Sequence, residues 1–322
     1  MSAYTSGFAA HLDRFVAWRK ASGVWNDHAT AEGLLYFDRH CAGIDPTAEA
    51  PTREMIDSWC QVRPTENASS NYCRTLVARQ FCDWARTRGI PAAEPPELPK
   101  PERDDYVPHA FTEDELRRFF EACDSIVPYM GRFESRVRKV QLPAFFRLLY
   151  SSGLRTTEAR LLSRSDVDLR HELVDVRRSK GYDQHYVALH PNMAAVLEAY
   201  DEAAERLQPG REWFFESPRG RRPHDRNWVI DNFNKLWREA NGDPDGVVAY
   251  DLRHNYAIEN IMSWEGDPFD QHDRLHRLSK SMGHRHISST LYYFSIVPAL
   301  HDKLLRLTEG PMDDVIPDVW EV

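Results

Sequence analysis

Cysteine is scarce in this chain of 322 residues, and its five cysteines form no recognisable pattern. No two of them make a Cys-x-x-Cys pair, and none has a histidine at metal-ligand spacing. This arrangement argues against the common zinc modules and against a disulfide framework. We expect all five to be reduced thiols in the core of a cytosolic protein: Cys41, Cys60, Cys73, Cys82 and Cys123.

Long apolar runs are also missing. No stretch approaches the roughly 18 apolar residues of a membrane-spanning helix, and the first residues show no basic segment followed by an apolar one. We therefore expect neither a membrane partner nor export, and a cytoplasmic location. No cluster of carboxylates resembles a two-metal site, so no metal and no other cofactor is expected.

The chain lacks an excess of positive charge. Its formal net charge is −9, whereas nucleic-acid-binding domains usually carry basic patches. Part of the acidity lies in residues 301–322, which hold 2 basic and 6 acidic side chains, a net of −4. Because DNA responds to the local field of one face, the composition does not exclude a DNA-binding protein. It does predict weak non-specific affinity for DNA.

Helical patterning, in contrast, is abundant, and 42% of the residues are apolar, which is enough to form cores. Apolar residues recur at helical spacing in residues 7–20, 29–41 and 67–90. Thr52 stands where a capping residue precedes one more helix. We expect residues 1–92 to form a helical domain.

Prolines divide the chain. Six of them fall in residues 91–108, which disfavours helix and favours an extended tether, so residues 93–109 are predicted to be a linker. A second domain then covers residues 110–322. It opens with a capping-box pattern, Thr112 and Glu115, and continues mainly as helices.

Two strand patterns interrupt these helices, Leu173–Arg177 and His185–Leu189, and a polar turn joins them. A last helical pattern covers residues 299–309. The predicted fold class is therefore mainly α: a helical N-terminal domain, then a mostly α domain with one small antiparallel β-sheet.

Two arginines of the second domain stand where a side chain can enter a cleft. Arg155 lies between a helix-ending glycine and the next helix, and Arg253 lies at the front of an apolar helix. Their planar guanidinium groups match the oxygens of a phosphate diester in a bidentate manner. Taken alone, Arg155 is explained more simply as a surface arginine.

Three further residues could share a phosphate with these arginines. Lys180, on the turn between the strands, can supply a positive charge or a proton. His284 can donate a hydrogen bond, and Tyr293 carries a hydroxyl. Each has a simpler structural explanation when taken alone. Only their combination and their order along the chain indicate a function.

Together these segments resemble the tyrosine recombinase, or phage integrase, family over about residues 110–300. That family carries, in order, an arginine in a Gly-Leu-Arg turn, a hairpin lysine, a His-x-x-Arg motif, a Gly-His pair and a nucleophilic tyrosine. The helical first domain and the proline-rich linker resemble the family's core-DNA-binding half. The corresponding residues here are Gly153-Leu154-Arg155 with Glu158, Lys180, Tyr250 to Arg253, Gly283-His284 and Tyr293.

One position departs from the family pattern. Tyr250 stands where the family usually has a histidine that assists proton transfer with the nucleophile. A phenol, with a reference pKa near 10, accepts a proton poorly at neutral pH. His254 is close in sequence, but on a helix we expect it to point about 100° away from its neighbour Arg253. Tyr292 is a rival nucleophile, and the family spacing favours Tyr293.

The resemblance implies a site-specific DNA recombinase that needs neither ATP nor metal. Tyr293 would attack a DNA phosphate and form a 3′-phosphotyrosyl intermediate. Arg155, Arg253 and His284 would stabilise the charge that builds on the phosphate. Lys180 would protonate the leaving 5′ oxygen.

The resemblance also implies partners, namely double-stranded DNA with inverted-repeat core sites and a homo- or hetero-tetramer of recombinases on it. Arg74 and Arg79 of the first domain are candidate DNA contacts, with a solvated helix face as the alternative. Docking of the C-terminal helix into a neighbouring protomer, or packing of that helix on its own domain, would use Leu300, Leu304, Leu305 and Leu307.

The biological role stays open among integration, excision and transposition of a mobile element and plasmid resolution. Three other interpretations of the chain also stay open. The acidic balance and Tyr250 favour a DNA-binding relative that has lost cleavage. A type IB topoisomerase-like enzyme would share the chemistry without site preference, and a helical interaction protein would have no role on DNA.

Overall fold

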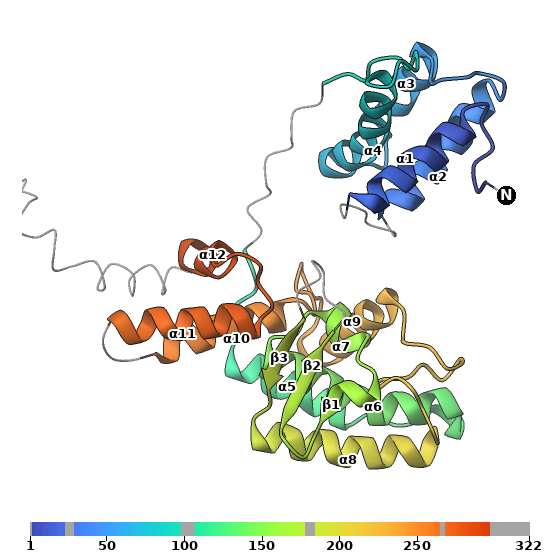
Figure 1. Cartoon of the computed structure of the whole chain (residues 1–322). Helices are drawn as coiled ribbons and strands as arrows, with labels where there is room; N and C mark the ends of the chain where they lie inside the picture. Colours follow the sequence, from blue (N-terminus) through green and yellow to red (C-terminus); the bar gives the residue numbers. More distant parts are fainter. Residues whose placement is uncertain (1, 23–28, 98–106, 178–183, 265–267, 297–322) are drawn as a thin grey trace, which may run out of the picture. The chain divides into compact units, whose positions relative to one another are not determined.

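The computed structural model divides the chain into two units, Met1–Tyr106 and Val107–Val322. The division falls inside the predicted linker, of which residues 98–106 lie outside the described part. Each unit has its own core and is described by itself (Figure 1). The structure describes residues 2–22, 29–97, 107–177, 184–264 and 268–296.

The first unit is helical in its described part, which confirms the prediction of a helical N-terminal half. The Thr52 hydroxyl caps its third helix by accepting a hydrogen bond from the Met55 backbone N–H. The side chain of Asn67 caps the fourth helix in the same way. The helices are α1 (Ala9–Ala21), α2 (Ala29–Ile44), α3 (Arg53–Cys60) and α4 (Ala68–Arg86).

The core of this unit is aromatic, with Phe8, Phe15, Phe37 and Phe81 fully buried against one another. Four of the five cysteines are buried free thiols, as predicted. The prediction is wrong for Cys73, which is exposed. The reason is the rotation of α4, which buries residues 71, 75 and 78 and turns position 73 to the opposite side.

The second unit is built from helices around one small sheet. The predicted capping box of Thr112 and Glu115 is present at the start of α5. The sequence analysis did not predict α11, because this polar helix has too few apolar residues to show a helical period. The α-helices are α5 (Glu113–Asp124), α6 (Phe133–Ser152), α7 (Thr156–Arg160), α8 (Pro191–Leu207), α9 (Arg226–Asn241), α10 (Asp251–Ser263), α11 (Pro268–Ser281) and α12 (Ser288–Ile296). Single-turn 3-10 helices cover Tyr129–Gly131 and Arg164–Asp166.

The sheet is antiparallel in the order β1-β2-β3, with β1 at Val167–Asp168, β2 at Leu173–Val176 and β3 at His185–Ala188. The predicted strand pair is confirmed, and β1 was missed because two residues carry no periodic signal. The register pairs Val176 with His185, which sets His185 at the start of β3.

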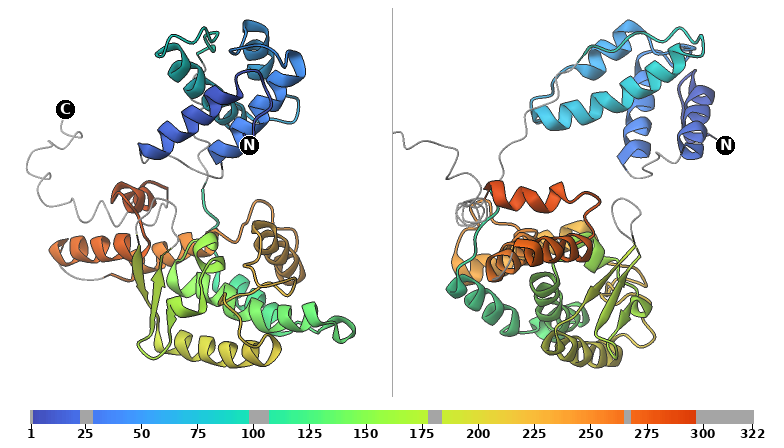
Figure 2. Two further views of the ribbon diagram at one scale, coloured as in Figure 1. Left: turned by 45° about the vertical axis from the view of Figure 1, so that its right-hand side comes forward. Right: turned by 60° about the vertical axis from the view of Figure 1, so that its left-hand side comes forward.

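In the right-hand view of Figure 2 the strands lie side by side at one edge of the second unit. Helix α6 packs against α5, α8 and α10. Helices α11 and α12 form a small second cluster with α10, next to β3. Among the described residues, no helix is both long and apolar enough to cross a membrane.

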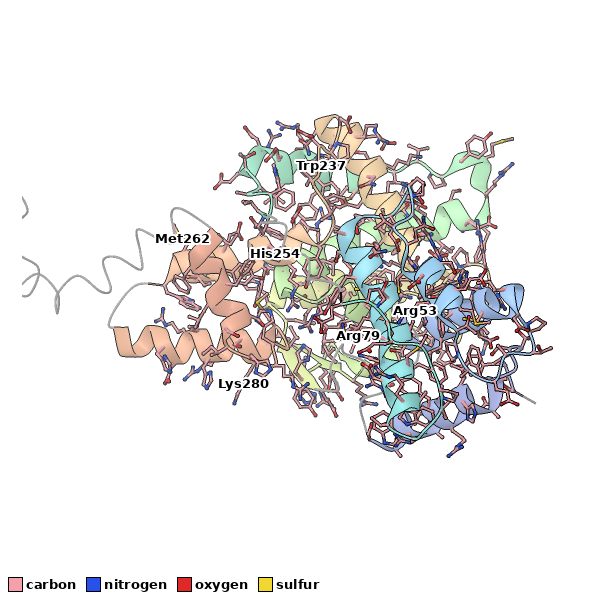
Figure 3. All side chains as sticks on the ribbon, turned by 90° about the horizontal axis from the view of Figure 1, so that it is seen from above. Arg53, Arg79, Trp237, His254, Met262 and Lys280 are labelled. Atoms are coloured by element: carbon pink, nitrogen blue, oxygen red, sulfur yellow. The ribbon has the colours of Figure 1, made fainter. Side chains whose placement is uncertain are left out.

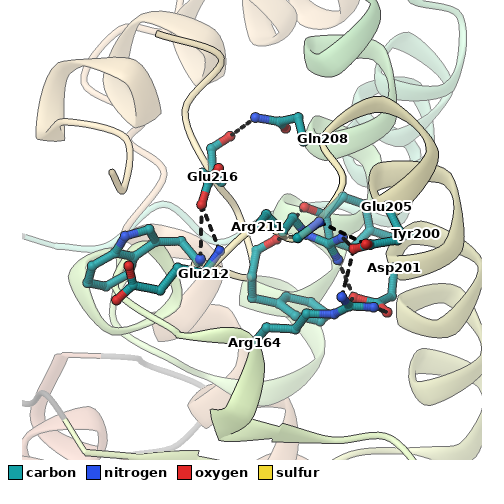
Figure 4. A network of polar contacts seen from close by, with 11 residues as sticks. Arg164, Tyr200, Asp201, Glu205, Gln208, Arg211, Glu212 and Glu216 are labelled. Atoms are coloured by element: carbon teal, nitrogen blue, oxygen red, sulfur yellow. Dashed lines mark hydrogen bonds and ion pairs between the residues drawn. The ribbon is translucent and has the colours of Figure 1, made fainter. Parts of the chain in front are cut away.

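A buried ion network fixes the end of α8 to the loop that follows it (Figure 4). The Arg211 side chain is fully buried and pairs with Asp201 and with Glu205, whose carboxylate lies 3.1 Å away. Arg164 reaches the same two carboxylates from the sheet side, at 2.7 and 2.6 Å, with 39% of its side chain exposed. The two arginines therefore make the same ion pairs at very different depths.

We expect Arg211→Met to lower the free energy of unfolding by about 2–3 kcal/mol, because it removes the fully buried cation of the network, which pairs with Asp201 and Glu205 and donates to the Phe214 carbonyl. The matched variant Arg164→Met should cost no more than about 1 kcal/mol, because solvent screens that arginine. Urea unfolding of the full chain measures both. Equal losses in the two variants would contradict the role assigned to burial.

Candidate active site

Arg155 is positioned by the end of α6. Gly153 terminates that helix with φ of +64°, and a Cβ there would come 2.4 Å from the ring of Tyr256, so only glycine fits. The buried Leu154 then anchors the turn, and Arg155 takes the position just before α7. The Arg155 guanidinium donates to the Gly283 carbonyl at 2.8 Å and to Glu158 at 2.5 Å.

Arg253 reaches the same two chain segments from α10. It is 1% exposed, and it donates to the carbonyls of Gly153 at 2.5 Å and Met282 at 2.6 Å. Since Arg155 also contacts Gly283, both arginines tie the Gly-Leu-Arg turn to the Gly-His turn. Segments more than a hundred residues apart thus meet around two guanidinium groups.

Glu158 lies between the two arginines and is 2% exposed. Its carboxylate is 2.5 Å from Arg155 and 3.9 Å from Arg253. Burial pushes its pKa up, but the charge and hydrogen bonds of Arg155, and then the charge of Arg253, bring the pKa below its ordinary value. The group therefore stays a carboxylate, and together with the two arginines it leaves one net positive charge.

Gly283 and His284 form a left-handed turn after α11. Gly283 has φ of +62°, and its Cα faces the ring of His185 on β3. His284 Nδ1 lies 2.7 Å from the Thr290 hydroxyl. Burial, and then the charges of Arg253 and Arg155, lowers the pKa of His284 to about 3. His284 is therefore neutral at pH 7 and offers a phosphate one N–H, without a charge.

Tyr293 comes from α12 and is 2% exposed. Its ring packs in the cluster that α10, α11 and α12 share, with Ile261 and Met282 among its members. Its hydroxyl lies 3.1 Å from Nδ1 of His254 on α10. Burial raises the pKa of the Tyr293 hydroxyl to about 12, despite the nearby charge of Arg253.

His254 is a neighbour of Tyr293 that the sequence analysis set aside. Figure 3 labels it on α10, with Met262 farther along the same helix. Helix α10 packs against both α6 and α12, and His254 makes its contact with Tyr293 of α12. Burial, and then Arg253, lowers the pKa of His254 to about 4. Only the position of α12 could have revealed this contact.

Tyr250 does not make the hydrogen bond described for Tyr293. It is 37% exposed and precedes the first residue of α10. Its ring meets the ring of His254 edge to face, with 5.0 Å between centroids. Tyr292, the rival nucleophile, is also 37% exposed. Lys180 lies outside the described residues, so its predicted role stays a prediction.

The two arginines proposed for DNA contact in the first unit differ in environment. Arg74 pairs with Glu66 at 2.7 Å with 11% of its side chain exposed, and it lies over the Trp59 ring. Arg79, labelled on α4 in Figure 3, is more exposed, with weaker pairs to Asp83 and Glu97. Arg79 is thus better placed to meet a phosphate, and both contacts stay predictions.

His185 is a second residue that the sequence did not single out. A Cβ added to Gly283 would come within 2.5 Å of Cε1 and 2.8 Å of Nδ1 of its ring. His185 also adds to the positive field that lowers the pKa of His284. A strand and the Gly-His turn therefore touch at a position where no side chain fits.

We expect Gly283→Ala to cut the DNA cleavage that the family resemblance implies by about 10- to 100-fold, because its methyl group would push His185 away and shift the carbonyl that holds Arg155. Gly131→Ala is the matched control, since its φ is +64° and nothing lies within 4 Å of an added Cβ. Both should lose about 1 kcal/mol to backbone strain, and only the first should lose cleavage. Single-turnover cleavage assays and urea unfolding measure the two effects, and equal cleavage by both variants would contradict this assignment.

Comparison with known families decides the class of this site. Residues 109–298 match the model of the phage integrase family, which is more than half of the chain. The chain belongs to the phage integrase family. It is a tyrosine recombinase, an enzyme of the class that breaks and rejoins DNA strands. The predictions of family, fold class and enzyme class are thereby confirmed.

Curated relatives of this integrase align over nearly its whole length. A putative integrase/recombinase of Sinorhizobium fredii, y4rB, is 26% identical over 96% of this chain and 99% of its own. Tyrosine recombinase XerC of Neisseria meningitidis serogroup C is 27% identical over 92% of this chain and 95% of its own.

Solved structures share the fold at low identity. XerH recombinase bound to a palindromic difH substrate has a TM-score of 0.60 at 13% identity, over 90% of this integrase and 82% of XerH. The Tn1549 transposon integrase in complex with a circular intermediate DNA has a TM-score of 0.58 at 12% identity, over 93% and 99% of the two chains. These likenesses concern the fold alone.

Proposed function

We propose that this integrase is a site-specific DNA recombinase whose nucleophile is Tyr293. The observation that carries the proposal is the convergence of Arg155, Arg253 and His284 on the two turns beside α12, where Tyr293 lies. Nothing but the fold brings these residues together, because they come from four separated segments.

Each guanidinium has five N–H donors. Arg253 places two of them on backbone carbonyls, which fixes the plane of the group and the direction of the rest. A phosphate bound there would meet donors that need no reorganisation as charge develops, which is commonly the largest contribution to catalysis. Neutral His284 would add one hydrogen bond.

In the proposed reaction the Tyr293 oxygen forms a bond to the scissile phosphorus, and the bond from phosphorus to the 5′ oxygen breaks. The products are a 3′-phosphotyrosyl linkage and a free 5′-hydroxyl, which takes its proton from Lys180. Attack by the 5′-hydroxyl of a partner strand reverses these changes and joins the exchanged strands. The covalent intermediate keeps the ester energy, so ATP is not required.

We further propose that the substrate is double-stranded DNA with inverted-repeat core sites, bound by four protomers, and that the enzyme moves a mobile element. The structures of XerH with a palindromic substrate and of the Tn1549 integrase with transposon right end DNA support this class of substrate. Integration, excision and transposition are the reactions within it, acting on nucleoid DNA.

The test begins with duplexes selected for binding to the full chain from a random-sequence pool, each nicked once at successive positions. These selected duplexes should give a protein–DNA adduct that survives SDS, because the nick lets the cleaved end escape. Binding without any adduct would instead support a relative that has lost cleavage. Relaxation of supercoiled plasmid without site preference would support a topoisomerase-like enzyme.

A further inference from the structure

The contact between His254 and Tyr293 joins the proposed nucleophile to a titratable group. The Tyr293 hydroxyl lies 3.1 Å from Nδ1 of His254, and the two rings meet at 65° with 5.6 Å between centroids. They come from different helices, α10 and α12, so the contact depends on tertiary packing. A hydrogen bond of this kind is the usual link between a nucleophile and its base.

We propose that His254 is the catalytic base for Tyr293, in the place that Tyr250 would occupy by sequence position. The inference rests on the proposed function. In the cleavage step, the proton of the Tyr293 hydroxyl passes to Nδ1 of His254 while the tyrosine oxygen bonds to phosphorus. In the rejoining step, His254 returns that proton to the departing tyrosine oxygen, so protons balance over the cycle.

The proposal defines the tautomer of His254. The phenol O–H donates to Nδ1, so the neutral imidazole carries its own proton on Nε2. Depression of the pKa of His254 to about 4 by burial and by Arg253 keeps Nδ1 available as an acceptor at pH 7. The raised pKa of Tyr293 means that the hydroxyl needs an acceptor in order to attack.

Other groups near the hydroxyl are less suited to this role. Tyr250 is a phenol, and its described contact is with the ring of His254. His284 places Nδ1 on Thr290, and Glu158 is held by Arg155. The titratable or charged groups that face the pair from the packed elements are Arg253 of α10, Tyr250 just before α10, Arg155 before α7, His185 of β3, His284 after α11 and Tyr292 of α12.

The activity test compares the cleavage rates of two variants, because asparagine keeps a hydrogen-bonding atom near the position of Nδ1 and leucine does not. Single-turnover cleavage of the selected duplexes should fall about 10²- to 10³-fold in His254→Asn at pH 7. The cleavage rate of His254→Leu should fall by at least as large a factor. Recovery of the full rate in His254→Asn would show that the histidine only positions the tyrosine, and this would overturn the proposal.

The pH profile separates a base from a structural residue. Wild-type cleavage should change little between about pH 6 and 8, because His254 stays neutral. In His254→Asn the rate should rise about tenfold per pH unit, because attack then depends on the small phenolate fraction. Tyr250→Phe should keep the wild-type slope. A wild-type slope in His254→Asn, or a lost plateau in Tyr250→Phe, would overturn the assignment.

A measurement without DNA separates failure of this inference from failure of the proposed function. In the ¹⁵N-histidine spectrum of the full chain at pH 7, His254 should show the Nε2–H tautomer. Its Nδ1 resonance should shift in Tyr293→Phe and stay in Tyr292→Phe. A protonated Nδ1, or an Nδ1 resonance that does not shift in Tyr293→Phe, would overturn the inference whether or not the protein cleaves DNA.

Discussion

Tyr293→Phe is expected to abolish the covalent DNA adduct while DNA binding persists. The substitution removes one oxygen from a ring that is already buried among apolar neighbours, so the fold should survive. The hydroxyl that it removes lies 3.1 Å from His254 and is close enough to Arg253 and Arg155 to feel their charge. Denaturing gels of reactions with the selected duplexes, and gel shifts on the same duplexes, measure adduct and binding separately.

The matched control for this experiment is the adjacent tyrosine. Tyr292→Phe removes the same oxygen from a ring that is 37% exposed, and the adduct should form at nearly the wild-type level. An adduct that is lost in Tyr292→Phe and retained in Tyr293→Phe would reverse the assignment of the nucleophile. Loss in both would point to a shared structural defect, which thermal unfolding would detect.

Arg253→Ala is expected to lower single-turnover cleavage by about 10³-fold or more, because it removes a preorganised cation from the proposed phosphate site. It should also destabilise the second unit, because the carbonyls of Gly153 and Met282 lose their shared donor and Glu158 loses one of its two cations. Binding of the selected duplexes should weaken far less than cleavage.

A second variant separates these two effects. Arg253→Lys keeps the positive charge but lacks the fork that spans two carbonyls, so it should recover part of the stability while cleavage stays low. Arg117→Ala, on the exposed face of α5, serves as the control for loss of an arginine. Cleavage by Arg253→Lys at the wild-type rate would contradict the idea that guanidinium geometry matters at this site.

Much of the secondary structure could be predicted from short-range sequence patterns. Helix caps, helical periods and one pair of strands were predicted because each depends on residues only a few positions apart. Thr52 and the capping box of Thr112 and Glu115 are examples. The polar helix α11 and the two-residue β1 were missed because they have too little periodic apolar content. The exposure of Cys73 depends on how α4 is rotated against the rest of its unit, which no local pattern specifies.

In the candidate site, too, local motifs could be predicted from the sequence and contacts made by tertiary packing could not. Arg155, Arg253, His284 and Tyr293 were predicted from the order of short motifs, and the structure shows the two arginines holding the Gly-Leu-Arg and Gly-His turns together. His254 was set aside because its angle on α10 was judged against Arg253 alone. The contact of His254 with Tyr293 depends on where α12 packs, which is set by tertiary structure and not by the local sequence.

The central claim is that Tyr293 forms the bond to DNA, and mass spectrometry of the adduct tests it directly. The selected duplex is trapped on the wild-type enzyme, then digested with nuclease and protease. We expect one modified peptide, in which a 3′-phosphonucleotide is attached to Tyr293. A nucleotide on Tyr292 or any other residue, or a 5′ linkage, would contradict it.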